Sequence, residues 1–132
     1  MPAVANDVGA DPVGLDEKVA RATEVARVRA SLRRKLYIEA EHHARAALSR
    51  RADDPVLLIL LAQALLAQEV DGHIAEVRRS LSRALAAQPD NDEGYVVAAA
   101  MYRRDGDHRR ASQGVVRSLR ASEGNGADPK RR

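Results

Sequence analysis

Residues 58–65 (LILLAQAL) and 95–102 (YVVAAAMY) share one spacing of bulky and small side chains, and this repetition decides the predicted fold. A bulky residue stands at each end of both stretches, around Leu61–Ala62 in one and Ala98–Ala99 in the other. Residues three, four and seven positions apart lie on one face of a helix, so each stretch predicts a helix with a packing face. A small residue in the middle of that face lets a second helix approach closely.

A second helical pattern follows each stretch after a break. Val77, Leu81 and Ala84 follow Asp71–Gly72, while Ala111 and Val115 follow residues 105–107 (DGD). Equivalent positions lie 37 residues apart, as Leu58 and Tyr95, Ala47 and Ala84, and Asp53 and Asp90 show. The pattern resembles the tetratricopeptide repeat (TPR), whose period is about 34 residues. We therefore expect three extra residues between the two helices of the middle repeat, accommodated by about one helical turn.

The resemblance implies an all-α fold, a right-handed stack of three helical hairpins of the α-solenoid type. It covers about residues 20–122, with repeats at 20–52, 53–89 and 90–122. We expect a disordered lead at 1–14, a TPR-like domain at 15–122 and a flexible basic tail at 123–132. Six helices are predicted at about 15–34, 36–50, 55–68, 73–88, 92–104 and 108–122.

Two turns carry clear signals. Asp54–Pro55 predicts an N-cap followed by a proline in the first helical turn. Gly106 is available for a left-handed cap between the fifth and sixth helices. The first helix has two possible registers, which place either Glu24, Arg27, Val28 and Ser31 or Val25, Val28, Arg29 and Leu32 at the repeat positions.

Composition favours a helical domain with a closely packed core. Hydrophobic residues make up 45% of the 132 residues, with no Phe, no Trp and three Tyr. The absence of cysteine excludes disulfides and thiolate metal sites. The start of the chain lacks the pattern of a secretory signal, and the apolar run 56–67 is too short to span a membrane, so we expect a cytoplasmic protein. The net charge is +3, and residues 15–52 alone carry +5 (ten Lys/Arg against five Asp/Glu).

In the TPR family, the first helices of successive repeats line a groove that receives a peptide or helix of another protein. The resemblance therefore implies a non-enzymatic adaptor or chaperone-like module. The matching groove positions are Ile59, Gln63, Leu66, Val96, Ala100 and Arg103. Because residues 56–67 are apolar almost all round, we expect Ile59 and Leu66 to remain for a partner.

Other interpretations are weaker. The apolar surface could instead be covered by the chain itself or by a second copy in a homodimer. Few groove arginines and no groove asparagine argue against a carboxylate clamp. The Arg pairs (33–34, 50–51, 78–79, 103–104 and 109–110) are interpreted as solvated helix faces rather than a nucleic-acid site, because stacking aromatics are missing. Glu39, His42 and His43 have metal-binding spacing without a second pair, so no metal site, cofactor or catalytic group is predicted.

Overall fold

Helices make up most of the part of the chain that the structure describes. The computed structural model describes the backbone of residues 12–124 and the side chains of residues 14–107 and Arg109. The elements are α2 (Pro12–Arg33), α3 (Tyr37–Leu48), α4 (Pro55–Ala67), the short 3₁₀-helix η1 (Asp71–His73), α5 (Ile74–Ala87) and α6 (Asp92–Gly124). The predicted all-α class is confirmed. The described residues form five α-helices, however, and not the six that the repeat predicts.

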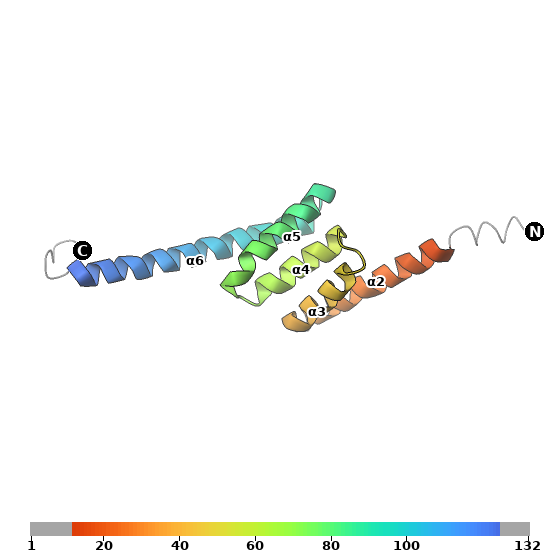
Figure 1. Ribbon diagram of the computed structural model, residues 1–132, viewed down its shortest axis with the longest axis horizontal. Coiled ribbons are helices and arrows are strands. Elements are labelled where there is room, and N and C mark those ends of the chain that lie inside the picture. Colours follow the sequence, from red (N-terminus) through yellow and green to blue (C-terminus); the bar gives the residue numbers. More distant parts are fainter. Residues whose placement is uncertain (1–11, 125–132) are drawn as a thin grey trace, which may run out of the picture.

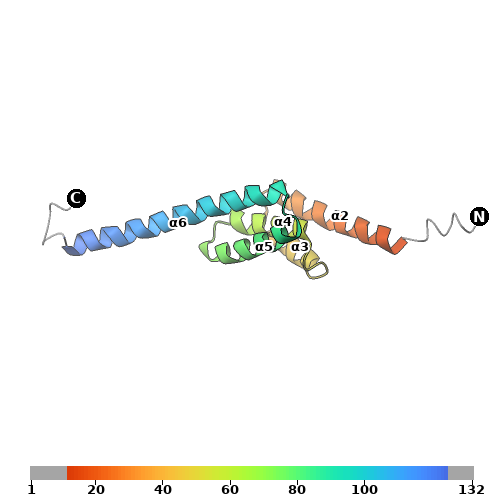
Figure 2. The same ribbon diagram turned by 90° about the horizontal axis from the view of Figure 1, so that it is seen from above.

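Consecutive helices form two hairpins, α2–α3 and α4–α5, and α6 packs against the second hairpin. Each helix contacts the next one in the chain, and α4 also contacts both α2 and α6. Figure 1 shows the amino-terminal part of α2 and the carboxyl-terminal part of α6 projecting from the body in opposite directions. In Figure 2, α2 and α6 lie along one side of the body, α3 and α5 lie along the other, and α4 runs between them.

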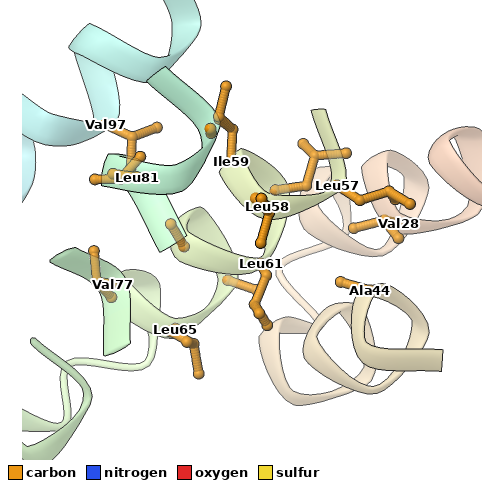
Figure 3. Packing of buried hydrophobic residues seen from close by; sticks show 14 of the residues in the cluster. Val28, Ala44, Leu57, Leu58, Ile59, Leu61, Leu65, Val77, Leu81 and Val97 are labelled. Carbon is orange, nitrogen blue, oxygen red and sulfur yellow. The ribbon is translucent and has the colours of Figure 1, made fainter. Parts of the chain in front are cut away.

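Helix α4 is the centre of the core, as its all-round apolarity predicts. Eight of its thirteen residues are buried. Figure 3 shows Leu57 directed toward Val28 of α2, while Leu81 of α5 lies near Val97 of α6. Ala62 and Ala84 are both fully buried, which allows the close contact between α4 and α5.

Local signals position the start of α4. The Asp54 side chain accepts hydrogen bonds from the backbone N–H groups of Val56 and Leu57, at 3.0 and 3.2 Å, and Pro55 occupies the first turn. These bonds satisfy backbone donors that have no partner inside the helix. The short helix η1 lies between α4 and α5, where the sequence places the break at Asp71–Gly72.

Helices α2 and α4 both end with a left-handed residue followed by an apolar one. Lys35 has φ 62° and precedes Leu36, while Glu69 has φ 58° and precedes Val70. After α2, the Leu36 N–H donates to the Ser31 carbonyl at 2.9 Å and the Lys35 N–H donates to that of Leu32 at 2.9 Å. This pairing is a Schellman motif, in which the apolar residue after the left-handed one covers the helix end.

The predicted break at residues 105–107 is wrong. Helix α6 runs through Gly106, and no described glycine has positive φ. The residue after Gly106 is Asp107, which cannot supply the apolar contact that Leu36 and Val70 supply. In addition, Arg109 Nη2 lies 3.1 Å from Asp105 Oδ2 one turn away, a pairing that favours the continuous helix. The side chains of Ala111 and Val115, predicted to pack in a third hairpin, lie outside the described residues.

The packing register of α6 also differs from the 37-residue alignment. Val97 is 6% exposed and Met101 is 2% exposed, whereas Tyr95 and Tyr102 are 50% and 60% exposed and Ala99 is exposed. An offset of 36 residues describes the contact better, because it pairs Leu58, Leu61, Ala62 and Leu65 with Gly94, Val97, Ala98 and Met101.

Both tyrosines have polar contacts at the surface, which explains why they face outward. The Tyr95 hydroxyl donates to the Pro89 carbonyl, and the Arg78 guanidinium lies 5.4 Å from the centre of the Tyr102 ring. Gly94 faces inward instead, where an added Cβ would lie 2.8 Å from Leu85 Cδ2. The absence of a side chain at Gly94 therefore lets α6 approach α5 closely.

In α2, neither predicted register is adopted in full. Val28, which both registers share, is fully buried, and Ser31 is 2% exposed. Val25 and Leu32 are partly buried beside the core, while Arg27 is exposed. The helix begins at Pro12, so the predicted lead is shorter than 14 residues, and residues 1–11 and 125–132 lie outside the described part.

Candidate functional site

One side of the molecule combines side chains from α2, α4 and α6, and we call it the groove face. A small cavity of about 130 Å³ lies there, lined by Arg29, Leu32, Arg33, Gln63 and Glu93. These residues come from three helices that are far apart in sequence, and α4 contacts both of the others. The cavity therefore exists only because α4 holds α2 and α6 on either side of itself.

An ion pair joins α2 and α6 across the groove face. Arg29 Nη1 lies 3.0 Å from Glu93 Oε2, and Arg29 Nη2 lies 3.2 Å from Glu93 Oε1. The two parallel hydrogen bonds fix the guanidinium and the carboxylate in one plane. Both side chains remain more than a third exposed, so water and salt weaken the pair. It is an ordered contact that a competing carboxylate could reach.

Two other polar side chains at this cavity have no such partner. Within the described residues, neither Arg33 nor Gln63 makes a side-chain hydrogen bond or an ion pair. Gln63 is half-buried and offers an N–H donor and a carbonyl acceptor, and Arg33 is exposed and offers only donors. The cavity therefore presents the unpaired hydrogen-bonding groups of Arg33 and Gln63 beside the Arg29–Glu93 ion pair.

The six predicted groove residues are only partly available. Ile59 is fully buried in the core, so its expected exposure is wrong: α6 lies close to it, since a Cβ added at Gly94 would lie 3.3 Å from Ile59 Cδ1. Leu66 and Ala100 are half-buried, Gln63 lines the cavity, and Val96 and Arg103 are exposed, Val96 at 69%. Glu93, Val96, Ala100 and Arg103 follow the helical spacing of one face of α6.

Sequence reasoning missed Arg33 and Glu93 as members of this cavity. It interpreted Arg33 as part of a solvated helix face and Arg29 only as a possible repeat position. It did not consider Glu93, which lies at the start of α6 and meets Arg29 from 64 residues away. No local pattern signals such a pair, but the spacing Glu93, Val96, Ala100 would have placed Glu93 on the same helix face.

Two larger cavities lie elsewhere. One of about 390 Å³ is formed between α3 and α5 and is lined by Arg45, Glu76, Arg79 and Arg83, among others. Arg45 there already binds Glu76, with Nη1 2.7 Å from Oε2, and Arg83 binds Asp53. A second cavity, of about 500 Å³, lies at the α2–α3 and α4–η1 turns, where the partly exposed Leu36, Ile38 and Val70 line it. Leu36 and Val70 follow the left-handed residues of those turns, which gives them a structural role.

Many arginines that were interpreted as solvated are instead ion-paired between elements. Arg50 and Arg51 both contact Glu24 of α2, Arg78 contacts Asp105 of α6, and Arg104 Nη1 lies 2.6 Å from Glu69 Oε1. These contacts attach α2 to the α3–α4 turn and α6 to the α4–α5 hairpin. These four arginines therefore have a structural role that the sequence alone does not reveal.

The most buried of these carboxylates is Asp54, whose side chain is 8% exposed beside Arg21. Burial opposes its ionisation, but the hydrogen bond from Arg21 and those from the Leu57 and Val56 N–H groups outweigh it, so the pKa of Asp54 is lowered. On the opposite side, the hydrogen bond from Arg45 likewise lowers the pKa of Glu76. Both carboxylates are therefore charged in the folded protein near neutral pH.

The described residues offer little for metal chemistry. His43 Nε2 lies 4.0 Å from Glu39 Oε2, and no group of three His, Cys, Asp or Glu in the described part could hold a metal ion. Among the described helices, none combines the length and the apolarity required to cross a membrane.

A search of family models, of curated proteins and of solved structures found no match to the chain.

Proposed function

We propose that the chain is a non-enzymatic protein-interaction module that binds a segment of another protein on its groove face. In this proposal the helices form a right-handed stack of two TPR-like hairpins, and α6 is the first helix of an incomplete third unit. The arrangement that supports this proposal is that α4 contacts both α2 and α6 on one side of itself, while α3 and α5 lie on the other side.

One observation carries the proposal. The groove face holds a cavity with the unpaired polar groups of Arg33 and Gln63, and the 69% exposed Val96 lies one turn along α6 from the cavity residue Glu93. Polar groups that converge on a cavity beside an exposed apolar side chain are typical of binding surfaces. The two larger cavities support the proposal less. Charged side chains of the cavity between α3 and α5 already form ion pairs, and two apolar side chains of the other cavity, Leu36 and Val70, belong to helix-ending turns.

Photo-crosslinking tests the proposal on the full chain. A photoreactive phenylalanine analogue replaces Val96 in one variant and the exposed Ser82 of α5 in a matched control, and both are irradiated in extract of the source cells. We expect a discrete adduct from position 96 and none from position 82. The adduct should disappear when Ala100, one turn away, is enlarged to Gln, because the larger side chain obstructs the same surface.

The outcomes are distinct. Equal labelling from positions 82 and 96, or no adduct from position 96, contradicts binding at the groove face. An adduct between two copies of the chain would instead support a homodimeric scaffold, whose apolar surface is covered by the chain's own second copy.

A further inference from the structure

We propose that the groove face selects an acidic segment of its partner, and that a carboxylate of this segment binds Arg33 while competing with Glu93 for Arg29. This inference rests on the proposed function and adds the chemistry of the partner. Its basis is the charge at the cavity, where two guanidinium groups face a single carboxylate.

The size of the cavity limits what can enter it. At about 130 Å³ it is smaller than the other two cavities described, and it suits one side chain that projects from a segment lying on the groove face. The carboxylate of Asp or Glu fits because guanidinium groups bind carboxylates through two parallel hydrogen bonds.

Gln63 supplies a second element of recognition. Its carboxamide has no hydrogen-bond partner among the described residues and offers one donor side and one acceptor side. A main-chain peptide group offers the complementary acceptor and donor. An extended acidic segment can therefore use Gln63 for its backbone and Arg33 for its side chain.

Glu93 acts as an internal competitor. Its carboxylate occupies Arg29 in the free protein, so a partner that also binds Arg29 must displace it. The pair is more than a third exposed on both sides, which makes such an exchange accessible to a ligand. Neutralising Glu93 should therefore strengthen binding of an acidic segment rather than weaken it.

The test uses the full chain and a library of immobilised random 12-residue peptides. We expect peptides containing Asp or Glu to be enriched over neutral and basic ones. For a selected acidic peptide, Arg33→Gln should lower the affinity about tenfold, which corresponds to the loss of one charge-assisted contact. Glu93→Gln should raise the affinity, and replacing the peptide's acidic residue by its amide should abolish the difference between wild type and Arg33→Gln.

Arg27→Gln is the matched control. Arg27 is also an exposed arginine of α2 without an ion pair among the described residues, but it does not line the cavity. The inference is overturned if selected peptides show no acidic enrichment, if Arg27→Gln and Arg33→Gln have equal effects, or if Glu93→Gln weakens binding. Selection of no peptide of any composition, together with no adduct at position 96, would instead refute the proposed function itself.

Discussion

Val96 and Val97 provide a direct test of the packing register of α6. They are adjacent and chemically identical, but Val97 is 6% exposed and packs in the core, whereas Val96 is 69% exposed. Val97→Ala removes two buried carbon groups at about 0.8 kcal/mol each and leaves a small cavity, for a loss of roughly 2 kcal/mol. Val96→Ala removes the same groups from water at almost no cost.

Helix propensity acts equally on both variants, because alanine favours a helix over valine by about 0.5 kcal/mol at either position. The net expectation is a free energy of unfolding lower by about 1.5 kcal/mol for Val97→Ala, and unchanged or slightly higher for Val96→Ala. Urea unfolding of the full chain, followed by circular dichroism at 222 nm, measures both values. Equal effects, or a larger loss for Val96→Ala, would refute the register described above.

Three further predictions concern caps and charge. Gly106→Ala should raise helix content and stability by up to about 1 kcal/mol, because α6 is helical there and an added Cβ meets nothing within 4 Å; a lower melting temperature would indicate a left-handed cap instead. Lys35→Gly should stabilise the fold by about 1 kcal/mol in thermal melts, because Lys35 has φ 62°; a loss would contradict that conformation. The pKa of Asp54 is lower in the folded protein than in the unfolded chain, where it is near 4, so its charge stabilises the fold above that pH. This stabilisation is lost as the pH falls through the pKa of the folded protein. Between pH 7 and pH 3 the melting temperature of Asp54→Asn should therefore fall by less than that of the wild type.

The elements with local signals could be predicted from the sequence. Asp54–Pro55 marks the start of α4, the apolar run after it predicts a helix buried on several sides, and Asp71–Gly72 marks the break between α4 and α5, where η1 lies. Each of these features depends on residues close together in the chain, such as a cap, a proline or a period of 3.6.

The end of the stack could not be predicted, because its signals conflict. Gly106 favours a left-handed cap, but such a cap also needs an apolar residue after it, and Asp107 stands there. The register of α6 was mispredicted because Tyr95 and Tyr102 match the bulky repeat positions, although their polar contacts hold them at the surface.

The candidate site was predicted only in outline. Of the predicted groove residues, Val96 and Arg103 are exposed and Gln63 lines a cavity, and their role in binding a partner stays a prediction. The burial of Ile59 depends on how closely α6 approaches α4, and the pairing of Arg29 with Glu93 joins residues 64 positions apart. Such long-range contacts follow from the packed structure and not from any local pattern.

The most direct test of the central structural claim is the length of α6, the helix that ends the groove face. Because the chain contains no cysteine, nitroxide labels attach only to the thiols introduced by Val96→Cys and Ser118→Cys. Pulsed electron paramagnetic resonance on the doubly labelled full chain should give a distance of about 33 Å, since 22 residues of continuous helix rise about 1.5 Å each. A distance below about 20 Å would contradict the account, because it would mean that the chain folds back at Gly106 into a third hairpin, with helix axes about 10 Å apart.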